Sequence, residues 1–274
     1  MTCAWKELLG ILPQWVGTQV APHEMTLQEI RLRIDRPPEF VLRNGCQWGT
    51  GRVTPDDLNY CINAASRYSP WSAATLSHGY LTAPGGHRIG VCGEAVIKDG
   101  TFTGIRHVRS LCIRIARDFP GLSDKVVFSG QALLILGAPG WGKTTLLRDM
   151  ARRVASVQTV AVVDERQELF PAGFQEGKRM DILFGCPKRQ GIETVLKTMT
   201  PDCIAVDEIT SADDCTAIAE AYGCGVRLIA TAHAAGMADF RRRCVYAPLL
   251  EQHIFDDFLI LHSDKSFHME ADCS

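Results

Sequence analysis

A phosphate-binding loop is the clearest chemical feature of this sequence. Residues 137–145 read GAPGWGKTT and match Gly-x4-Gly-Lys-Thr. Glycines let the backbone curl so that several N–H groups face phosphate oxygens beside a helix N-terminus. In this pattern Lys143 reaches the β- and γ-phosphates of a nucleotide, and the Thr144 hydroxyl is a ligand of Mg²⁺. A glycine-rich turn that only packs is the alternative. The predicted ATP-binding residues are Gly137, Ala138, Pro139, Gly140, Trp141, Gly142, Lys143, Thr144 and Thr145.

Two acidic residues, Asp207 and Glu208, directly follow the apolar run 203–206. Open α/β sheets bind ligands at the carboxyl ends of their strands. We therefore expect Asp207 to hold Mg²⁺, usually through water, and Glu208 to orient or deprotonate an attacking water. A glutamate in this role indicates hydrolysis rather than group transfer to a small acceptor. The alternative is a pair of solvated acids at a strand end.

Two further apolar runs also end in polar residues. Asp164 and Glu165 follow residues 159–163, and either acid could join the metal–water network. A structural salt link through Arg166 is an equal alternative. His233 lies just past residues 226–230, where a polar side chain can sense the γ-phosphate. A histidine satisfied within the core is the other interpretation.

Arginines in the first half of the chain are candidates for a different role. Hydrolases of this kind often need an arginine from a neighbouring domain or subunit, which is worth about 10³ to 10⁵ in rate. Arg114 is the preferred candidate because Ile113 and Ile115 flank it in an expected strand, and Arg88 is second. Any single arginine here is more often a solubilising surface residue. The set considered is Arg88, Arg106, Arg109, Arg114 and Arg117.

The elements that position these residues follow an alternating order. Residues 132–136 form a continuous apolar run, as expected of a strand buried on both faces of a parallel sheet. A helix is expected over 145–154, and further strands over 159–163, 203–206 and 226–230. A capping box at 211–214 begins another helix that ends near Gly223. Strand–helix alternation of this kind predicts a parallel, doubly wound sheet.

Residues 1–120 have a different pattern and predict a smaller α+β domain before the ATPase domain, which spans 121–274. Residues 30–34 alternate apolar and basic side chains, as a half-buried strand does. A capping box at 54–57 begins a helix, and a hairpin is expected to turn through residues 84–86. Residues 111–117 alternate again, and 118–124 read as a linker.

Composition narrows the class of protein. The 274 residues carry a net charge of −2 and are 46% hydrophobic, so a general attraction to nucleic acid is not expected. The 11 cysteines form no Cys-x-x-Cys pair, which favours buried thiols in a reducing compartment. No apolar run approaches the roughly 20 residues of a spanning helix, and no signal peptide is recognised. We expect a cytoplasmic protein that reaches a membrane only through a partner.

Several longer segments together resemble a known family. In order and spacing, GAPGWGKTTLLRDMAR, VVDERQEL, DILFGCPK, MTPDCIAVDEI and LIATAH are similar to the stage III sporulation protein AA family. That family belongs to the secretion-ATPase branch of P-loop NTPases. The resemblance implies a RecA-like ATPase core with an added N-terminal domain and a hexameric ring. It also implies a role in endospore formation, in which ATP hydrolysis powers a channel complex between mother cell and forespore. The implied partners are copies of this chain and a membrane protein of that complex.

Two departures from the family pattern stand out. Trp141 occupies a loop position that is usually small, and its side chain should point away from the phosphates. Thr210 and Ser211 follow the segment VDEI, where relatives often carry Gly followed by Arg. The leading hypothesis is a Mg²⁺-dependent ATPase. The alternatives are a P-loop ATPase that binds nucleic acid and a nucleotide-gated assembly scaffold with little turnover.

Overall fold

A computed structural model describes residues 3–66, 79–128, 130–171 and 173–271. The chain divides into two compact units. The N-terminal unit comprises Met1–Asp118 with Pro171–Phe174, and the C-terminal unit comprises Phe119–Phe170 with Gln175–Ser274. Each unit has a hydrophobic core of its own.

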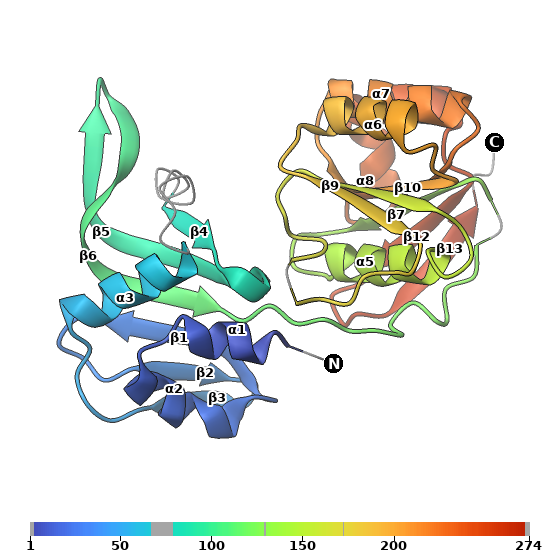
Figure 1. The fold of residues 1–274 in the computed structure, drawn as a ribbon. Coiled ribbons are helices and arrows are strands. Elements are labelled where there is room, and N and C mark those ends of the chain that lie inside the picture. Colours follow the sequence, from blue (N-terminus) through green and yellow to red (C-terminus); the bar gives the residue numbers. More distant parts are fainter. Residues whose placement is uncertain (1–2, 67–78, 129, 172, 272–274) are drawn as a thin grey trace. The chain divides into compact units, whose positions relative to one another are not determined.

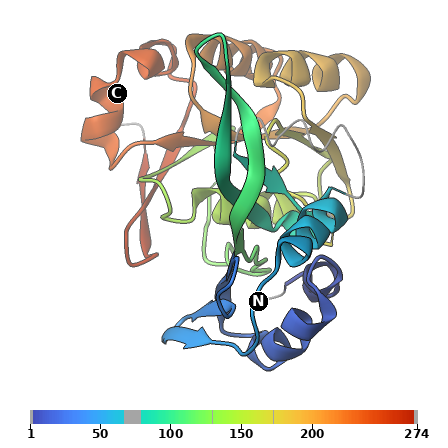
Figure 2. The ribbon, with the colours of Figure 1, turned by 90° about the vertical axis from the view of Figure 1, so that its left-hand side faces the viewer.

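The N-terminal unit is built on an antiparallel sheet with the strand order β3-β2-β1-β6-β5-β4 (Figure 1). Its side chains alternate as the sequence predicts, because Ile30 and Leu32 are fully buried while Arg31 and Arg33 are partly exposed. The strands are β1 (Leu27–Arg33), β2 (Glu39–Leu42), β3 (Gly45–Trp48), β4 (Tyr80–Thr82), β5 (Arg88–Lys98) and β6 (Thr101–Arg114). Strands β5 and β6 continue past the rest of the sheet as a long hairpin, drawn in green in Figures 1 and 2.

Helices pack on this sheet. The predicted capping box is present, since Thr54 Oγ1 accepts from the Asp57 N–H and the Asp57 carboxylate accepts from the Thr54 N–H. The helix that it begins buries Leu58, Cys61 and Ala65. Two short helices before β1 were not predicted. The helices are α1 (Trp5–Gly10), α2 (Gln14–Val20) and α3 (Pro55–Ala65).

The C-terminal unit has the predicted doubly wound architecture. Its described residues form a seven-stranded sheet in the order β13-β12-β7-β11-β10-β8-β9, and all neighbours are parallel except β12 and β13. The sequence did not predict β9, β12 or β13. The strands are β7 (Ala132–Gly137), β8 (Val160–Asp164), β9 (Met180–Phe184), β10 (Cys203–Ile209), β11 (Arg227–His233), β12 (Asp257–Leu261) and β13 (Phe267–Ala271).

Helices cover both faces of this sheet (Figure 1). Helix α5 buries Leu147 and Met150 against Leu133 and Ile135 of β7, whereas α6 and α7 pack on the opposite face with Leu134 and Leu136. Every residue of β7 is buried, as its continuous apolar run predicts. The helices are α5 (Lys143–Val154), α6 (Lys188–Thr198), α7 (Ala212–Gly223), α8 (Met237–Arg242) and α9 (Ala247–Glu251). Helix α5 begins at Lys143, two residues before the predicted start, while α7 spans the range expected from its capping box.

This sheet order explains how distant segments meet. Strands β7, β11, β10 and β8 are consecutive neighbours, and these are the strands that the predicted motifs follow. Because the four strands are parallel, their carboxyl ends lie along one edge of the sheet.

Candidate nucleotide site

The loop between β7 and α5 has the backbone conformation of a phosphate cradle. Gly140 and Gly142 have φ angles of 76° and 102°, which side chains with a Cβ rarely adopt. A Cβ at either position would meet nothing within 4 Å, so the need for glycine is conformational rather than spatial. The first turn of α5 follows at once and directs its free N–H groups toward the loop.

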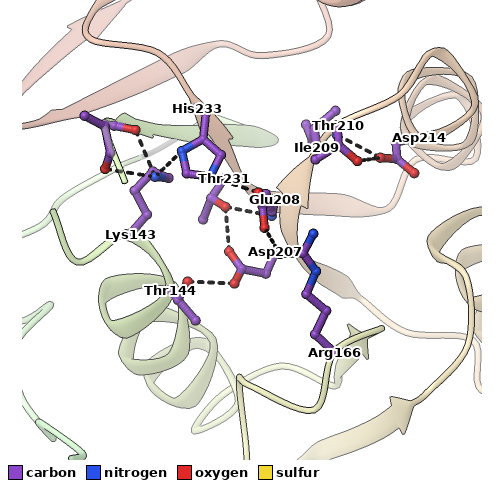
Figure 3. Close-up of polar contacts among 12 residues, drawn as sticks. Lys143, Thr144, Arg166, Asp207, Glu208, Ile209, Thr210, Asp214, Thr231 and His233 are labelled. Atoms are coloured by element: carbon purple, nitrogen blue, oxygen red, sulfur yellow. Dashed lines mark hydrogen bonds and ion pairs between the residues drawn. The ribbon is translucent and has the colours of Figure 1, made fainter. Parts of the chain in front are cut away.

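Lys143 contacts both the phosphate loop and the end of β11 (Figure 3). Its Nζ donates to the carbonyl oxygens of Gly137 and Ala138 at 2.8 and 3.2 Å, and lies 3.0 Å from Nδ1 of His233. Burial lowers the pKa of Lys143, and the nearby charges of Asp207 and Glu208 oppose that effect. The predicted phosphate-binding lysine and the predicted sensor histidine are thus in direct contact.

Asp207 is held by two hydroxyl groups. Thr144 Oγ1 donates to Asp207 Oδ2 at 2.7 Å, and Thr231 Oγ1 donates to Asp207 Oδ1 at 2.6 Å. Hydroxyl and carboxylate oxygens are hard ligands of the type that Mg²⁺ prefers. The pair Thr144 and Asp207 therefore fits the cation that the sequence predicts. Among the residues that the structure describes, no group of three or more His, Cys, Asp or Glu forms a protein-only metal cluster.

Glu208 is oriented by two partners from other strand ends. Its Oε1 lies 2.9 Å from Nε2 of His233, and its Oε2 accepts from Nη1 of Arg166 at 2.6 Å. A lysine ammonium can only donate, so His233 accepts from Lys143 through Nδ1 and donates to Glu208 through Nε2. One hydrogen-bonded chain therefore runs from Lys143 through His233 to Glu208 and Arg166 (Figure 3).

The acids that follow β8 have separate environments. Asp164 is buried and accepts from the backbone N–H groups of Glu168 and Leu169 at 3.0 and 2.8 Å. Burial raises the pKa of Asp164, while these backbone bonds oppose the rise. Glu165 accepts from Lys188 Nζ at 2.5 Å. Asp164 thus orders the turn after β8, and the salt link of Arg166 goes to Glu208 instead of its sequence neighbours.

Lys188 is a member of this edge that the sequence did not reveal. Its side chain is only 6% exposed and lies between Glu165 and Asp214, at 2.5 and 3.9 Å. Lys188 ends the segment DILFGCPK, but nothing in that segment indicates that the lysine is buried beside two carboxylates. The residues Asp164, Glu165, Arg166, Glu168, Lys188, Asp207 and Glu208 line one small cavity.

The candidate arginines belong to the N-terminal unit. Arg114 Nε lies 3.5 Å from Glu29 Oε1, and the Arg114 side chain is 68% exposed. Arg88 is the cross-strand partner of Arg114 and places its guanidinium 4.2 Å from the ring centre of Tyr80. These contacts lie within the sheet of the N-terminal unit, and a role for either arginine toward a nucleotide stays a prediction.

Trp141 and Thr210, the two departures from the family pattern, each have defined contacts in the C-terminal unit. Trp141 is partly buried and packs against the core on the α5 face of the sheet. Thr210 donates from its N–H and from its hydroxyl to Asp214 Oδ2, at 2.8 and 3.1 Å. This position thus extends the capping box of α7.

Proteins of known sequence are similar to this chain over most of its length. Stage III sporulation protein AA of Bacillus subtilis (strain 168) is 34% identical over 283 residues, which covers 94% of this chain and 91% of that protein. Protein SEEDLING PLASTID DEVELOPMENT 1 of Arabidopsis thaliana is 25% identical, and the match covers 82% of this chain and 33% of that protein.

Solved structures show the same fold. The ATPase DotB of Legionella pneumophila matches with a TM-score of 0.64 and 18% identity, over 94% of this chain and 79% of that one. The pilus retraction motor PilT, solved with bound ADP, matches with a TM-score of 0.68 and 12% identity, over 94% of this chain and 82% of that one.

None of the helices in the described part of the chain combines the length and the apolar composition that crossing a bilayer requires. The model of the family "Sporulation stage III, protein AA" matches residues 8–269. Because this match spans nearly the whole chain and agrees with the similarity to the Bacillus protein, the chain belongs to the sporulation stage III protein AA family.

Proposed function

We propose that this chain is a Mg²⁺-dependent ATPase. The observation that carries the proposal is the connected chain Lys143–His233–Glu208, which links the predicted phosphate-binding group to the predicted water-activating group. A nucleotide-binding fold of this class is supported by the likeness to DotB and PilT. Hydrolysis by this chain, and the role of each residue in it, are our proposals.

Each residue has a defined task in this scheme. The loop N–H groups and Lys143 bind the phosphates, and Thr144 with Asp207 holds Mg²⁺, which neutralises phosphate charge when bound. Glu208 orients the attacking water and accepts its proton. His233 holds one Glu208 oxygen and Arg166 holds the other.

His233 also couples phosphate binding at Lys143 to the hydrogen bonding of Glu208. A phosphate oxygen that attracts the Lys143 ammonium competes with His233 Nδ1 for the same donor. Loss of that donor changes the hydrogen bonding of the imidazole and, through Nε2, of Glu208. His233 can thus report occupancy of the phosphate site to the residue that handles water.

Two predicted catalytic residues take other positions in the proposal. Glu165 is bonded to Lys188, so we assign it to shaping the edge of the site rather than to the metal–water network. Arg114 remains the candidate for a positive charge supplied from a neighbouring subunit, since it is largely exposed.

We further propose that hydrolysis drives a membrane-associated secretion or channel complex during endospore formation. Membership of the sporulation family supports the setting, and the likeness in fold to the ATPase DotB and to the pilus retraction motor PilT supports mechanical work. In this proposal the chain acts in the cytoplasm as a hexameric ring and is recruited by a membrane protein. The near-zero net charge of −2 makes nucleic acid a less suitable partner.

The test is ATP hydrolysis and ATP binding by the purified full chain. Lys143→Ala should lose binding, whereas Glu208→Gln should bind ATP and lose turnover by about 10²-fold or more. The exposed Glu176→Gln is the control and should match wild type. Wild-type turnover in Glu208→Gln contradicts the assignment. A wild-type chain that binds ATP and shows no turnover dependent on Lys143 is a nucleotide-gated scaffold instead.

A further inference from the structure

A mostly apolar pocket adjoins the phosphate loop within the C-terminal unit. Its volume is about 230 Å³, and Gly142 and Thr145 form the side nearest the loop. Sites that hold a whole small-molecule ligand measure about 300–1,000 Å³, so this pocket has room for one part of a nucleotide. Its apolar lining includes Phe119, Leu122, Trp141, Leu261 and Phe267.

The β12–β13 hairpin forms one wall of the pocket and is fixed to the phosphate loop. Leu261 and Phe267 are cross-strand partners at the end of this hairpin. Lys265, in the connecting turn, donates from Nζ to the Gly140 carbonyl at 2.5 Å. A Cβ at Gly137 would lie 3.2 Å from Leu261 Cβ, so the hairpin also packs closely on the start of the loop. Pocket and cradle are therefore built from the same segments.

The position of the pocket suits the base of the nucleotide. Phosphates bound at the N-terminus of α5 lie against the first turn of that helix, and Thr145 in this turn also lines the pocket. The distance from α-phosphate to base is bridged by one ribose. We propose, on the basis of the proposed ATPase function, that the pocket receives a purine base stacked on Trp141 and Phe267 and reads neither its amino nor its carbonyl group.

The lining supports stacking rather than recognition of the base edge. None of the described side chains around the pocket is a carboxylate or a carboxamide, the groups that pair best with base edges. Lys265 can only donate hydrogen bonds and is already bonded to Gly140. Aromatic stacking tolerates different bases because every base has a π-face. ATP and GTP should therefore bind with similar affinity.

The probes are ATP, GTP and inorganic tripolyphosphate, which has phosphates and no base. Trp141 is suited as a reporter because it lines the pocket, and the variant Trp141→Phe separates its signal from that of the tryptophans at positions 5, 15, 48 and 71. ATP and GTP should each change its emission and bind within about threefold of one another, while tripolyphosphate should bind about tenfold more weakly and leave the emission unchanged. In Trp141→Phe the emission change on ATP binding should disappear.

Variants separate the base pocket from the phosphate site. Phe267→Ala should weaken ATP about tenfold and tripolyphosphate by less than about twofold. Phe184→Ala removes an exposed aromatic side chain outside the pocket and is the matched control. If Phe267→Ala does not fold, the affinities of the wild-type protein for the three probes still test the proposal.

Four results would each overturn the inference. Equal affinity for ATP and tripolyphosphate, or no response of Trp141 to ATP, would show that the base does not bind in this pocket. Either result is compatible with the proposed phosphate site. A preference for ATP over GTP of more than about tenfold shows that the base edge is read. Binding of neither ATP nor tripolyphosphate defeats the proposed ATPase function itself.

Discussion

Thr231 donates a 2.6 Å hydrogen bond from its hydroxyl to Oδ1 of Asp207. The same hydroxyl oxygen accepts from the backbone N–H of Glu208 at 2.8 Å. Glu208 has a φ angle of 56°, a left-handed conformation that costs a residue with a side chain of this kind of order 1–3 kcal/mol. One fully buried threonine on β11 thus fixes both acids at the end of β10.

Replacing Thr231 by Val should disturb both acids. Valine has a similar shape but offers no donor to Asp207 and no acceptor to the Glu208 N–H, so the free energy of unfolding should fall by about 1–3 kcal/mol. ATP turnover should fall, and the Mg²⁺ concentration needed for half-maximal turnover should rise. Thr231→Ser, which keeps the hydroxyl, should retain most of the stability and most of the ATP turnover.

Thr194→Val is the control for that experiment. The Thr194 hydroxyl donates to the backbone carbonyl of Gln190 at 2.7 Å, but at an exposed position, so its loss should cost less than about 0.5 kcal/mol. A Thr231→Val protein with the turnover and Mg²⁺ requirement of wild type would show that the hydroxyl does not position Asp207.

Lys188 should be a stabilising residue of the site edge. Its side chain is 6% exposed and neutralises Glu165, which is 37% exposed, so Lys188→Met leaves a partly buried carboxylate without its partner. Breaking a fully buried pair costs about 3–5 kcal/mol; partial exposure reduces the expected loss to about 1–3 kcal/mol. Chemical denaturation measures it. Lys197→Met, at a 76% exposed lysine paired with Glu193, should change stability by less than about 1 kcal/mol.

Glu165→Gln distinguishes a structural acid from a catalytic one. Because its carboxylate is engaged by Lys188, the variant should keep ATP turnover within about threefold of wild type, which corresponds to less than about 1 kcal/mol in the barrier. A loss of about 10²-fold or more, similar to that expected for Glu208→Gln, would return Glu165 to the water-activating network.

The stability of the N-terminal unit should depend on pH through His87. The ring is fully buried, with Nε2 3.0 Å from Ala4 O and Nδ1 accepting from the Ala116 N–H at 3.2 Å. Burial lowers the pKa of His87 below its usual value, so the folded unit binds its proton less readily than the unfolded chain. The folded unit therefore has its full stability above about pH 6.5, the ordinary histidine pKa. It loses stability as the pH falls from there toward the lower pKa that His87 has in the folded state.

The measurement for His87 is denaturant unfolding at pH 7.5 and 5.5. Wild type should lose stability between these values by at most about 1.4 kcal/mol per pH unit. His87→Gln should be less stable at pH 7.5 and show a smaller loss on acidification. His107→Gln, at a side chain 78% exposed, should keep the wild-type slope, and an unchanged slope in His87→Gln would contradict the assignment.

The sequence predicts that these polar residues share one edge of a sheet, because most of them follow apolar stretches that are easy to recognise as strands. Strands β8, β10 and β11 each carry polar residues directly after a short apolar stretch, and β7 leads into the phosphate loop. The observed order of the parallel strands then brings Lys143, Asp207 and His233 together.

Other features depend on tertiary contacts that no local pattern reveals. Helices α1 and α2 have six and seven residues, too few for a clear apolar period. Strand β12 becomes a neighbour of β7 only through the sheet order, although residues 258–261 form an ordinary apolar run. The partner of Arg166 could not be predicted, because Glu208 is 42 residues away in sequence while Asp164 and Glu165 are adjacent.

A crystal structure of Glu208→Gln with ATP and Mg²⁺ tests the central claim most directly. The claim is that the ends of four neighbouring strands form one site for a magnesium-bound triphosphate. It predicts the β- and γ-phosphates between the loop N–H groups and Lys143, with the cation beside Thr144 and Asp207. A nucleotide bound elsewhere, or phosphates out of reach of Lys143 with no cation near Asp207, would contradict it.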